Sequence, residues 1–241
     1  MNSERKPPLK PIDIGSYNKN QAESQRLTEE VYGKYPDGVT LTSEYAELVQ
    51  DNLLHVLIRL ARDKFVTKML KKTDSVLEVG SGSGLGAIFL AQHCNHVTGI
   101  EVKTTEVEEA RTLNKRSNVE FRACDLLEVP EQEKFDAVVS LDVIEHMSVE
   151  MGHRFVKAKA SHMKDDGLMI IGTPSIHSFP YQSALSQASH VKCYDLPELL
   201  DVVNPYVKRT IAFSMNDELV HTGFAKLAWY YFVIGFGHNA N

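Results

Sequence analysis

The chain has 241 residues, 43% of them hydrophobic and 24% charged, which suits an ordinary globular protein of one domain or at most two small ones. Lys and Arg number 26 and Asp and Glu 32, so the formal net charge of -6 disfavours a nucleic-acid-binding protein. The three cysteines, Cys94, Cys124 and Cys193, are spaced too widely for a disulfide framework or a paired-cysteine zinc site. We therefore expect a protein of the reducing cytoplasm.

The first 41 residues are polar and hold four of the nine prolines, which predicts a flexible N-terminal arm that could act as a lid. They lack the uninterrupted apolar segment of an export signal. The longest apolar run, Leu227 to Phe236, is too short to span a bilayer, so we expect no membrane partner.

A helical pattern begins the main domain, which we predict to cover residues 42–241. Over 42–72, apolar residues recur at three- and four-residue steps and predict one long helix or two broken ones. They are Leu48, Leu53, Leu54, Leu57, Ile58, Ala61, Phe65 and Leu70.

Short apolar runs then alternate with amphipathic stretches, a rhythm typical of parallel strands joined by crossover helices. The predicted strands are 75–79, 97–100, 119–122, 137–141 and 168–172, with helices from 84 and around 105–115, 149–163 and 196–203. Two last runs, 207–215 and 228–236, are expected to pair antiparallel at one edge of the sheet. Such sheets bind ligands beyond the carboxyl ends of their strands.

The first of these strand ends carries alternating glycines, Gly80, Gly82 and Gly84, separated by Ser81 and Ser83. Glycine lets the backbone turn sharply and approach a ligand closely, and the following helix presents free N–H groups. This pattern predicts a cofactor loop. A dinucleotide fingerprint is the alternative, but counting from Gly80 places Leu85 where its third glycine belongs.

With Glu78 before it, this loop resembles motif I of the class I S-adenosylmethionine-dependent methyltransferases. The resemblance implies a Rossmann-like, mostly parallel α/β sheet of seven strands with helices on both faces and an antiparallel C-terminal hairpin strand. It also implies S-adenosylmethionine as cofactor, held by Glu78, Gly80, Ser81, Gly82 and Gly84. The Glu78 carboxylate suits the ammonium of the methionine end and would repel a diphosphate.

The next two strand ends supply the remaining adenosine contacts. Glu101 can accept hydrogen bonds from the two ribose hydroxyls, as it could in a dinucleotide site. The resemblance implies that Val102 packs on the adenine and that Asp125 accepts from the adenine amino group, with Cys124 and Leu126 beside it.

The fourth strand end reads Leu141-Asp142-Val143-Ile144-Glu145-His146 and is similar to the small-molecule members of the ubiquinone and type 11/12 groups. The resemblance covers roughly residues 70 to 173 by motif and the rest by element order. It implies that Leu141 and Asp142 lie at the cofactor.

The resemblance implies that an arginine on the helix before the first strand contacts the carboxylate of the methionine end, which the planar fork of arginine suits. Arg59 is the predicted residue, with Arg62 one turn away. The alternative is a surface arginine paired with an acid such as Asp63.

The resemblance implies an acceptor site built from the fourth strand end, an insertion at 174–206, and the N-terminal arm and helix with Tyr17, Tyr45 and His55. The hydroxyls, imidazoles and aromatic rings of the insertion suit a polar acceptor. His146 is the first candidate for a catalytic base and His190 the second. We predict no metal, since His93 and His96 lie away from the strand carboxyl ends.

These features predict an O-methyltransferase acting on a sugar, a glycan precursor or another polar small molecule. An N-methyltransferase and a non-catalytic scaffold that keeps the cofactor fold are alternatives, and an NAD-binding oxidoreductase is less favoured. A nucleic-acid acceptor is disfavoured by the acidic balance and by the lack of a base-holding segment after the fourth strand. The oligomeric state stays open.

Overall fold

The computed structural model describes residues 21–239, except for the side chains of residues 43 and 44. The chain divides into two compact units, Met1–Thr40 and Leu41–Asn241. In the first unit, residues 21–32 form helix α1 (Gln21–Tyr32), whose residues are all exposed. Arg26 pairs there with Glu23 and Glu30 at 2.8 and 3.0 Å, one turn away on either side. The predicted arm is thus helical over residues 21–32, and residues 1–20 lie outside the described part. Its action as a lid stays a prediction.

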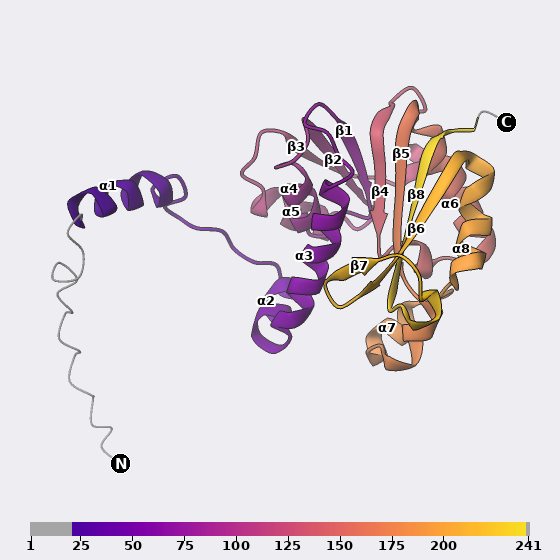
Figure 1. Cartoon of the computed structure of the whole chain (residues 1–241). Coiled ribbons are helices and arrows are strands. Elements are labelled where there is room, and N and C mark those ends of the chain that lie inside the picture. Colours follow the sequence, from indigo (N-terminus) through magenta and orange to yellow (C-terminus); the bar gives the residue numbers. More distant parts are fainter. Residues whose placement is uncertain (1–20, 240–241) are drawn as a thin grey trace, which may run out of the picture. The chain divides into compact units, whose positions relative to one another are not determined.

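The second unit contains an eight-stranded sheet in the order β3-β2-β1-β4-β5-β8-β6-β7 (Figure 1). The strands β1 to β5 pair in parallel and cover Ser75–Val79, His96–Glu101, Val119–Ala123, Phe135–Leu141 and Met163–Pro174. Three antiparallel pairings extend the sheet beyond β5. Strand β8 (Tyr230–His238) pairs with β5, β6 (Val207–Asn216) pairs with β8, and β7 (Leu219–His221) pairs with β6. The predicted α/β fold with its antiparallel C-terminal strands is therefore confirmed.

The sheet has one strand more than predicted. Strand β7 spans three residues and pairs only with the end of β6, through a tight turn in which Asp217 adopts a φ of 49°. An acidic residue tolerates this left-handed conformation better than most side chains do. So short a strand leaves no periodic signal in a sequence.

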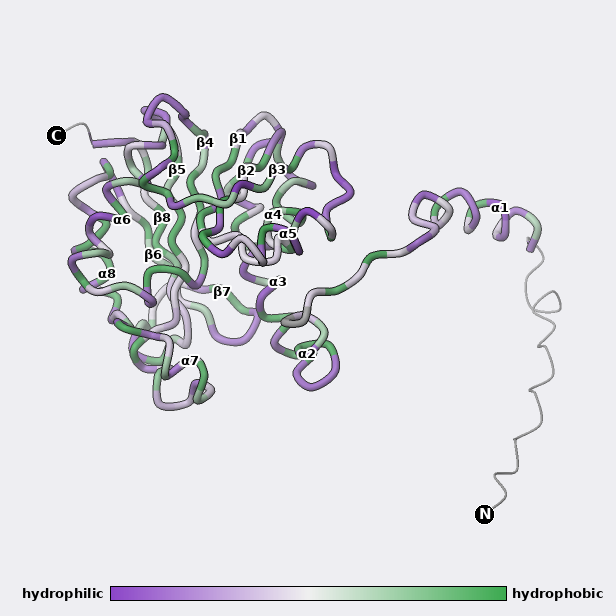
Figure 2. Tube along the Cα trace, turned by 180° about the vertical axis from the view of Figure 1, so that it is seen from behind, coloured by the Kyte–Doolittle hydropathy of each residue, from purple (hydrophilic) through white to green (hydrophobic). Residues whose placement is uncertain are grey.

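Helices cover both faces of the sheet, and alternate strand residues point to the two sides. On β5, Ile170 belongs to the core under α3 (Leu53–Thr67), α4 (Leu85–Leu90) and α5 (Thr104–Leu113). Its neighbours Met169 and Ile171 belong to the core under α6 (Val149–Ser161) and α8 (Leu196–Val203). The buried strands form the hydrophobic interior seen in Figure 2.

The N-terminal helical segment is broken into α2 (Ser43–Asp51) and α3 at Asn52. The Asn52 backbone N–H closes α2, and its side chain accepts from the His55 N–H at 3.3 Å to begin α3. Because α3 ends before β1 begins, its N-terminal half lies toward the carboxyl ends of the strands. None of the described helices is long and apolar enough to cross a membrane.

Candidate functional site

The glycine loop after β1 is held open by backbone conformations that favour glycine. Gly80, Gly82 and Gly84 have φ values of 75°, 50° and 88°. The N–H groups of Gly80 and Ser81 donate to the Ile100 carbonyl at 2.9 and 3.1 Å, which ties the loop to β2. The loop therefore lies across the carboxyl ends of two neighbouring strands, as predicted for a cofactor loop.

The three glycines differ in what surrounds them. A Cβ at Gly80 would lie 2.4 Å from the Val143 side chain, and one at Gly84 would lie 2.7 Å from both Ala110 and Phe121. At Gly82 the nearest atom would be Glu106 Oε2, at an ordinary 3.5 Å. Core packing thus requires Gly80 and Gly84, while Gly82 is the loop glycine whose surroundings leave room for a ligand.

Glu78 is buried at the end of β1, where its carboxylate points at the start of α4. The Ala87 N–H donates to it, while Glu78 Oε2 is buried without a hydrogen-bond partner. Burial, and then the nearby Asp63 carboxylate, raise the pKa of Glu78 well above its usual range. An unpaired buried carboxylate oxygen is costly and fits a site that receives a donor group from a ligand.

Glu101 anchors the second strand end to the glycine loop. Its Oε2 accepts from the Gly82 N–H at 3.3 Å and its Oε1 from the Lys103 N–H at 3.1 Å. Both oxygens retain lone pairs for further donors such as ribose hydroxyls. The next side chain, Val102, is 67% exposed, and its packing on an adenine stays a prediction.

The third strand end differs in part from the predicted adenine site. Asp125 is exposed, but its Oδ1 accepts from the Leu127 N–H at 2.9 Å and caps a short 3-10 turn over Leu126–Glu128. Leu126 is buried in the core, whereas Leu127 is 51% exposed. A contact from Leu126 to an adenine would therefore come from its backbone, and Cys124 lies partly buried beside it.

The two predicted arginines have different surroundings. Arg62, with 13% of its side chain exposed, donates to Asp142 at 2.7 Å and stacks on the Tyr230 ring with 4.0 Å to the centroid. Arg59 is partly buried one turn before it, and its positive charge lowers the pKa of Asp63. Arg62 is thus committed to Asp142, and Arg59 stays the predicted carboxylate contact.

Asp142 follows Leu141 at the end of β4 and has a φ of 56°, which is uncommon for a residue other than glycine. Its N–H donates to the Gly172 carbonyl at 3.0 Å, so the turn is fixed to β5. Strained backbone of this kind clusters at functional sites. The turn directs the following residues, Ile144–His146, across the carboxyl edge of the sheet.

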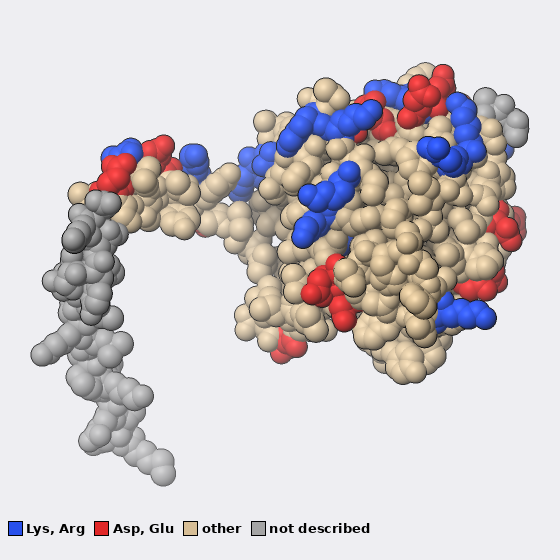
Figure 3. Space-filling model, viewed as in Figure 1, with Lys and Arg blue, Asp and Glu red and all other residues tan. Residues whose placement is uncertain are grey.

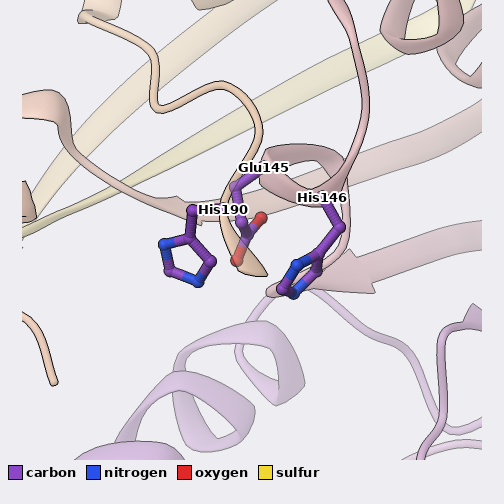
Figure 4. Close-up of side chains that lie close together, drawn as sticks. All are labelled: Glu145, His146 and His190. Atoms are coloured by element: carbon purple, nitrogen blue, oxygen red, sulfur yellow. The ribbon is translucent and has the colours of Figure 1, made fainter. Parts of the chain in front are cut away.

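Glu145, His146 and His190 come together at this edge (Figure 4). The two imidazole rings lie 5.0 Å apart, and His146 Nδ1 lies 3.0 Å from the Ser189 carbonyl. Two backbone N–H groups of the insertion, from Val191 and Lys192, donate to the Glu145 carbonyl at 2.8 and 3.0 Å. The insertion is therefore fixed to the fourth strand end, and both predicted base candidates face one site.

Burial shifts the pKa values of two residues in this cluster. Glu145 Oε2 accepts from the Thr173 hydroxyl at 2.9 Å, but Oε1 is buried without a partner, and burial raises the pKa of Glu145 to about 8. Burial, and then the neighbouring His146, lower the pKa of His190. A neutral imidazole at His190 can accept a proton.

The same three residues could hold a metal ion, which the sequence analysis did not predict. Each offers one ligand atom, and these atoms lie within 4.8 Å of one another. If the Ser189 carbonyl takes the proton of His146 Nδ1, Nε2 of that ring is left to coordinate. The sequence does not identify Glu145 and Asp63 as site residues. Their raised pKa values result from burial and from contacts with residues that are distant in the sequence.

A model of a methyltransferase domain matches residues 76–167. The ubiquinone biosynthesis O-methyltransferase of Rickettsia conorii is 29% identical over 147 residues, which are 60% of this chain and 50% of that protein. That of Rickettsia felis is 34% identical over 100 residues, which are 41% and 40% of the two chains. The chain thus spans about half the length, or less, of these curated relatives.

Solved structures show the same fold. A methyltransferase from Thermotoga maritima has a TM-score of 0.62 at 16% identity and covers 80% of this chain and 94% of its own. An N-methyltransferase from Bradyrhizobium japonicum, solved with S-adenosyl-L-homocysteine, has a TM-score of 0.53 at 16% identity, covering 78% and 86%.

Proposed function

We propose that the chain is a class I S-adenosylmethionine-dependent methyltransferase that methylates a hydroxyl of a small molecule, which the methyltransferase domain matched over residues 76–167 supports. The observation that carries the proposal is the loop at Gly82, joined through its N–H to Glu101, next to the unpartnered oxygen of Glu78. These groups offer an acceptor for an ammonium, two for ribose hydroxyls and space for a backbone approach.

When bound, the cofactor supplies an electrophilic sulfonium methyl group for in-line displacement. The residues of this chain then have two tasks, alignment of the acceptor and removal of one proton from its hydroxyl. Glu78, Glu101 and Arg59 would hold the cofactor. His146 and His190 lie where the insertion meets the fourth strand end, next to the proposed acceptor.

The acceptor proposed from the sequence is a sugar, a glycan precursor or another polar metabolite such as an oxygenated ring. The edge that carries the histidines favours a ring with an apolar body, because apolar side chains are exposed there. They are Ile176, Tyr181, Leu185, Phe224 and Trp229. The lobe around α7 (Ala184–Ser189) also carries few charged side chains (Figure 3).

We propose His146 as the general base, with His190 as the second candidate. His146→Asn should lose most of kcat and the acidic limb of the pH–rate profile while cofactor affinity survives. His190→Asn is measured in parallel. The matched control is His93→Asn, because His93 precedes β2 and so lies toward the amino ends of the parallel strands, away from the proposed site. Full turnover in both site variants would refute the base assignment.

A second candidate mechanism uses a divalent cation in place of a histidine base. Glu145, His146 and His190 form a ligand set of one carboxylate and two imidazoles, of which the carboxylate has an unpartnered buried oxygen. Bound there, a cation would lower the pKa of an acceptor hydroxyl. Chelation should then abolish turnover and Mn²⁺ or Zn²⁺ should restore it, whereas a base mechanism predicts no change.

Two other classes of function give different results in the same assays. An N-methyltransferase would methylate amines and not hydroxyls in a panel of acceptors with labelled cofactor. A non-catalytic scaffold would bind S-adenosylhomocysteine and turn over no acceptor in a metabolite extract. We propose no nucleic-acid partner, which a labelled RNA and DNA panel would test.

A further inference from the structure

Resting on the proposed function, we infer that the neighbouring carboxyl groups of Asp63 and Glu78 retain a proton in the cofactor-free protein and release it when the ammonium of the cofactor binds. Glu78 would contact the ammonium, and Asp63 would act through Glu78 as a positioning residue. The inference makes cofactor affinity depend on pH in the neutral range.

The two carboxylates approach one point in the fold. A Cβ at Gly86 would lie 2.6 Å from Glu78 Oε1 and 3.3 Å from Asp63 Oδ1, so both groups face the first turn of α4. Asp63 reaches this point from α3, and Glu78 reaches it from the end of β1. Both residues are buried, so little water screens the repulsion between two negative charges.

The charged groups around the pair do not neutralise it. Burial raises the pKa of Asp63 to about 7, against the opposing effects of Arg62 and Arg59 and with a further contribution from Asp142. Arg62 is itself paired with Asp142. Among the described residues, the Ala87 N–H is what opposes the effect of burial and of Asp63 on the pKa of Glu78. The pair therefore retains a proton near neutral pH in the absence of a ligand.

An ammonium beside Glu78 reverses this preference, because an opposite charge favours the ionised carboxylate. Binding then expels the proton, and linkage requires the affinity to weaken as the pH falls. The loss approaches tenfold per pH unit where one whole proton is released. Above the pH at which both groups are ionised, the dependence disappears.

The test is isothermal calorimetry with S-adenosylhomocysteine at pH 7 in phosphate and in Tris, whose different ionisation enthalpies report the protons released. We expect wild type to release roughly half to one proton. Asp63→Asn removes one of the two carboxylates and should reduce both the release and the pH dependence of the affinity between pH 6 and 8, while the burial of Glu78 maintains the remainder. Asp74→Asn is the matched control, since Asp74 is equally exposed, at 7%, but lies before β1 at its other end.

A second ligand separates the contribution of the ammonium group to proton release from that of the adenosine. 5′-Methylthioadenosine lacks the amino acid end and should bind wild type without proton release. Wild type that binds S-adenosylhomocysteine with no buffer-dependent enthalpy would overturn the inference and leave the proposed function standing. Equal release with both ligands would also overturn it, and absence of S-adenosylhomocysteine binding would instead refute the proposed function.

Discussion

At the scale of single residues, Gly82 and Gly84 are two positions apart in one loop but are needed for different reasons. Gly84→Ala should destabilise the fold by about 2 kcal/mol, because the new methyl group meets Ala110 and Phe121. Gly82→Ala should cost about 1 kcal/mol for its left-handed backbone and weaken S-adenosylhomocysteine binding at least tenfold. Urea unfolding measures the stability of each variant, and calorimetry measures its affinity for S-adenosylhomocysteine. The distinction is contradicted if both variants lose affinity in the same proportion to their loss of stability.

The raised pKa of Asp63 also leads to a prediction of how the free energy of unfolding varies with pH. Its pKa is about 7 in the folded protein and lower when unfolded, so the unfolded state loses its proton first as the pH rises. The free energy of unfolding should therefore fall between about pH 4 and pH 7, by an amount on the order of a few kcal/mol. Asp63→Asn, which stays neutral, should reduce that fall, and Glu145 and Glu78 contribute the remainder.

Urea unfolding at pH 5 and pH 8 measures this dependence. Asp63→Asn should be more stable than wild type at pH 8 and similar to it at pH 5. A variant that loses stability equally at both pH values would contradict the prediction.

At the scale of elements, the periodic parts of the chain were predictable and the short irregular parts were not. Strand β1 begins and ends where its apolar run predicts, because both faces of a central strand are buried. Strand β5 begins at Met163, five residues before its prediction, since exposed Lys164, Asp165 and Asp166 interrupt the apolar pattern. Helix α7 and strand β7 are too short to show a period.

The helix α3 yields a prediction that separates structural from binding roles. Arg62→Ala should destabilise the fold by about 2 kcal/mol, because it leaves Asp142 without its ion pair and uncovers the Tyr230 ring. Arg59→Ala should instead weaken S-adenosylhomocysteine binding about tenfold. Binding of 5′-methylthioadenosine, which has no carboxylate, should not change in the Arg59 variant. The assignment of Arg59 fails if S-adenosylhomocysteine binds it as tightly as wild type.

At the scale of the whole molecule, the sequence predicts which strand ends carry chemistry but not which side chains meet across them. Glu78 and Glu101 were identifiable because each follows a strand that the pattern reveals. The approach of His190 to His146, and of Asp63 to Glu78, depends on how the insertion and α3 pack on the sheet. Such contacts follow from tertiary structure, and no local spacing encodes them.

The central claim is that the carboxyl edge of this sheet binds S-adenosylmethionine and not a dinucleotide. The most direct test is calorimetry of the purified wild-type chain with S-adenosylhomocysteine and, separately, with NADH. The account predicts saturable binding of S-adenosylhomocysteine at one site per chain and none of NADH, because Glu78 would repel a diphosphate. Binding of NADH without binding of S-adenosylhomocysteine would contradict it.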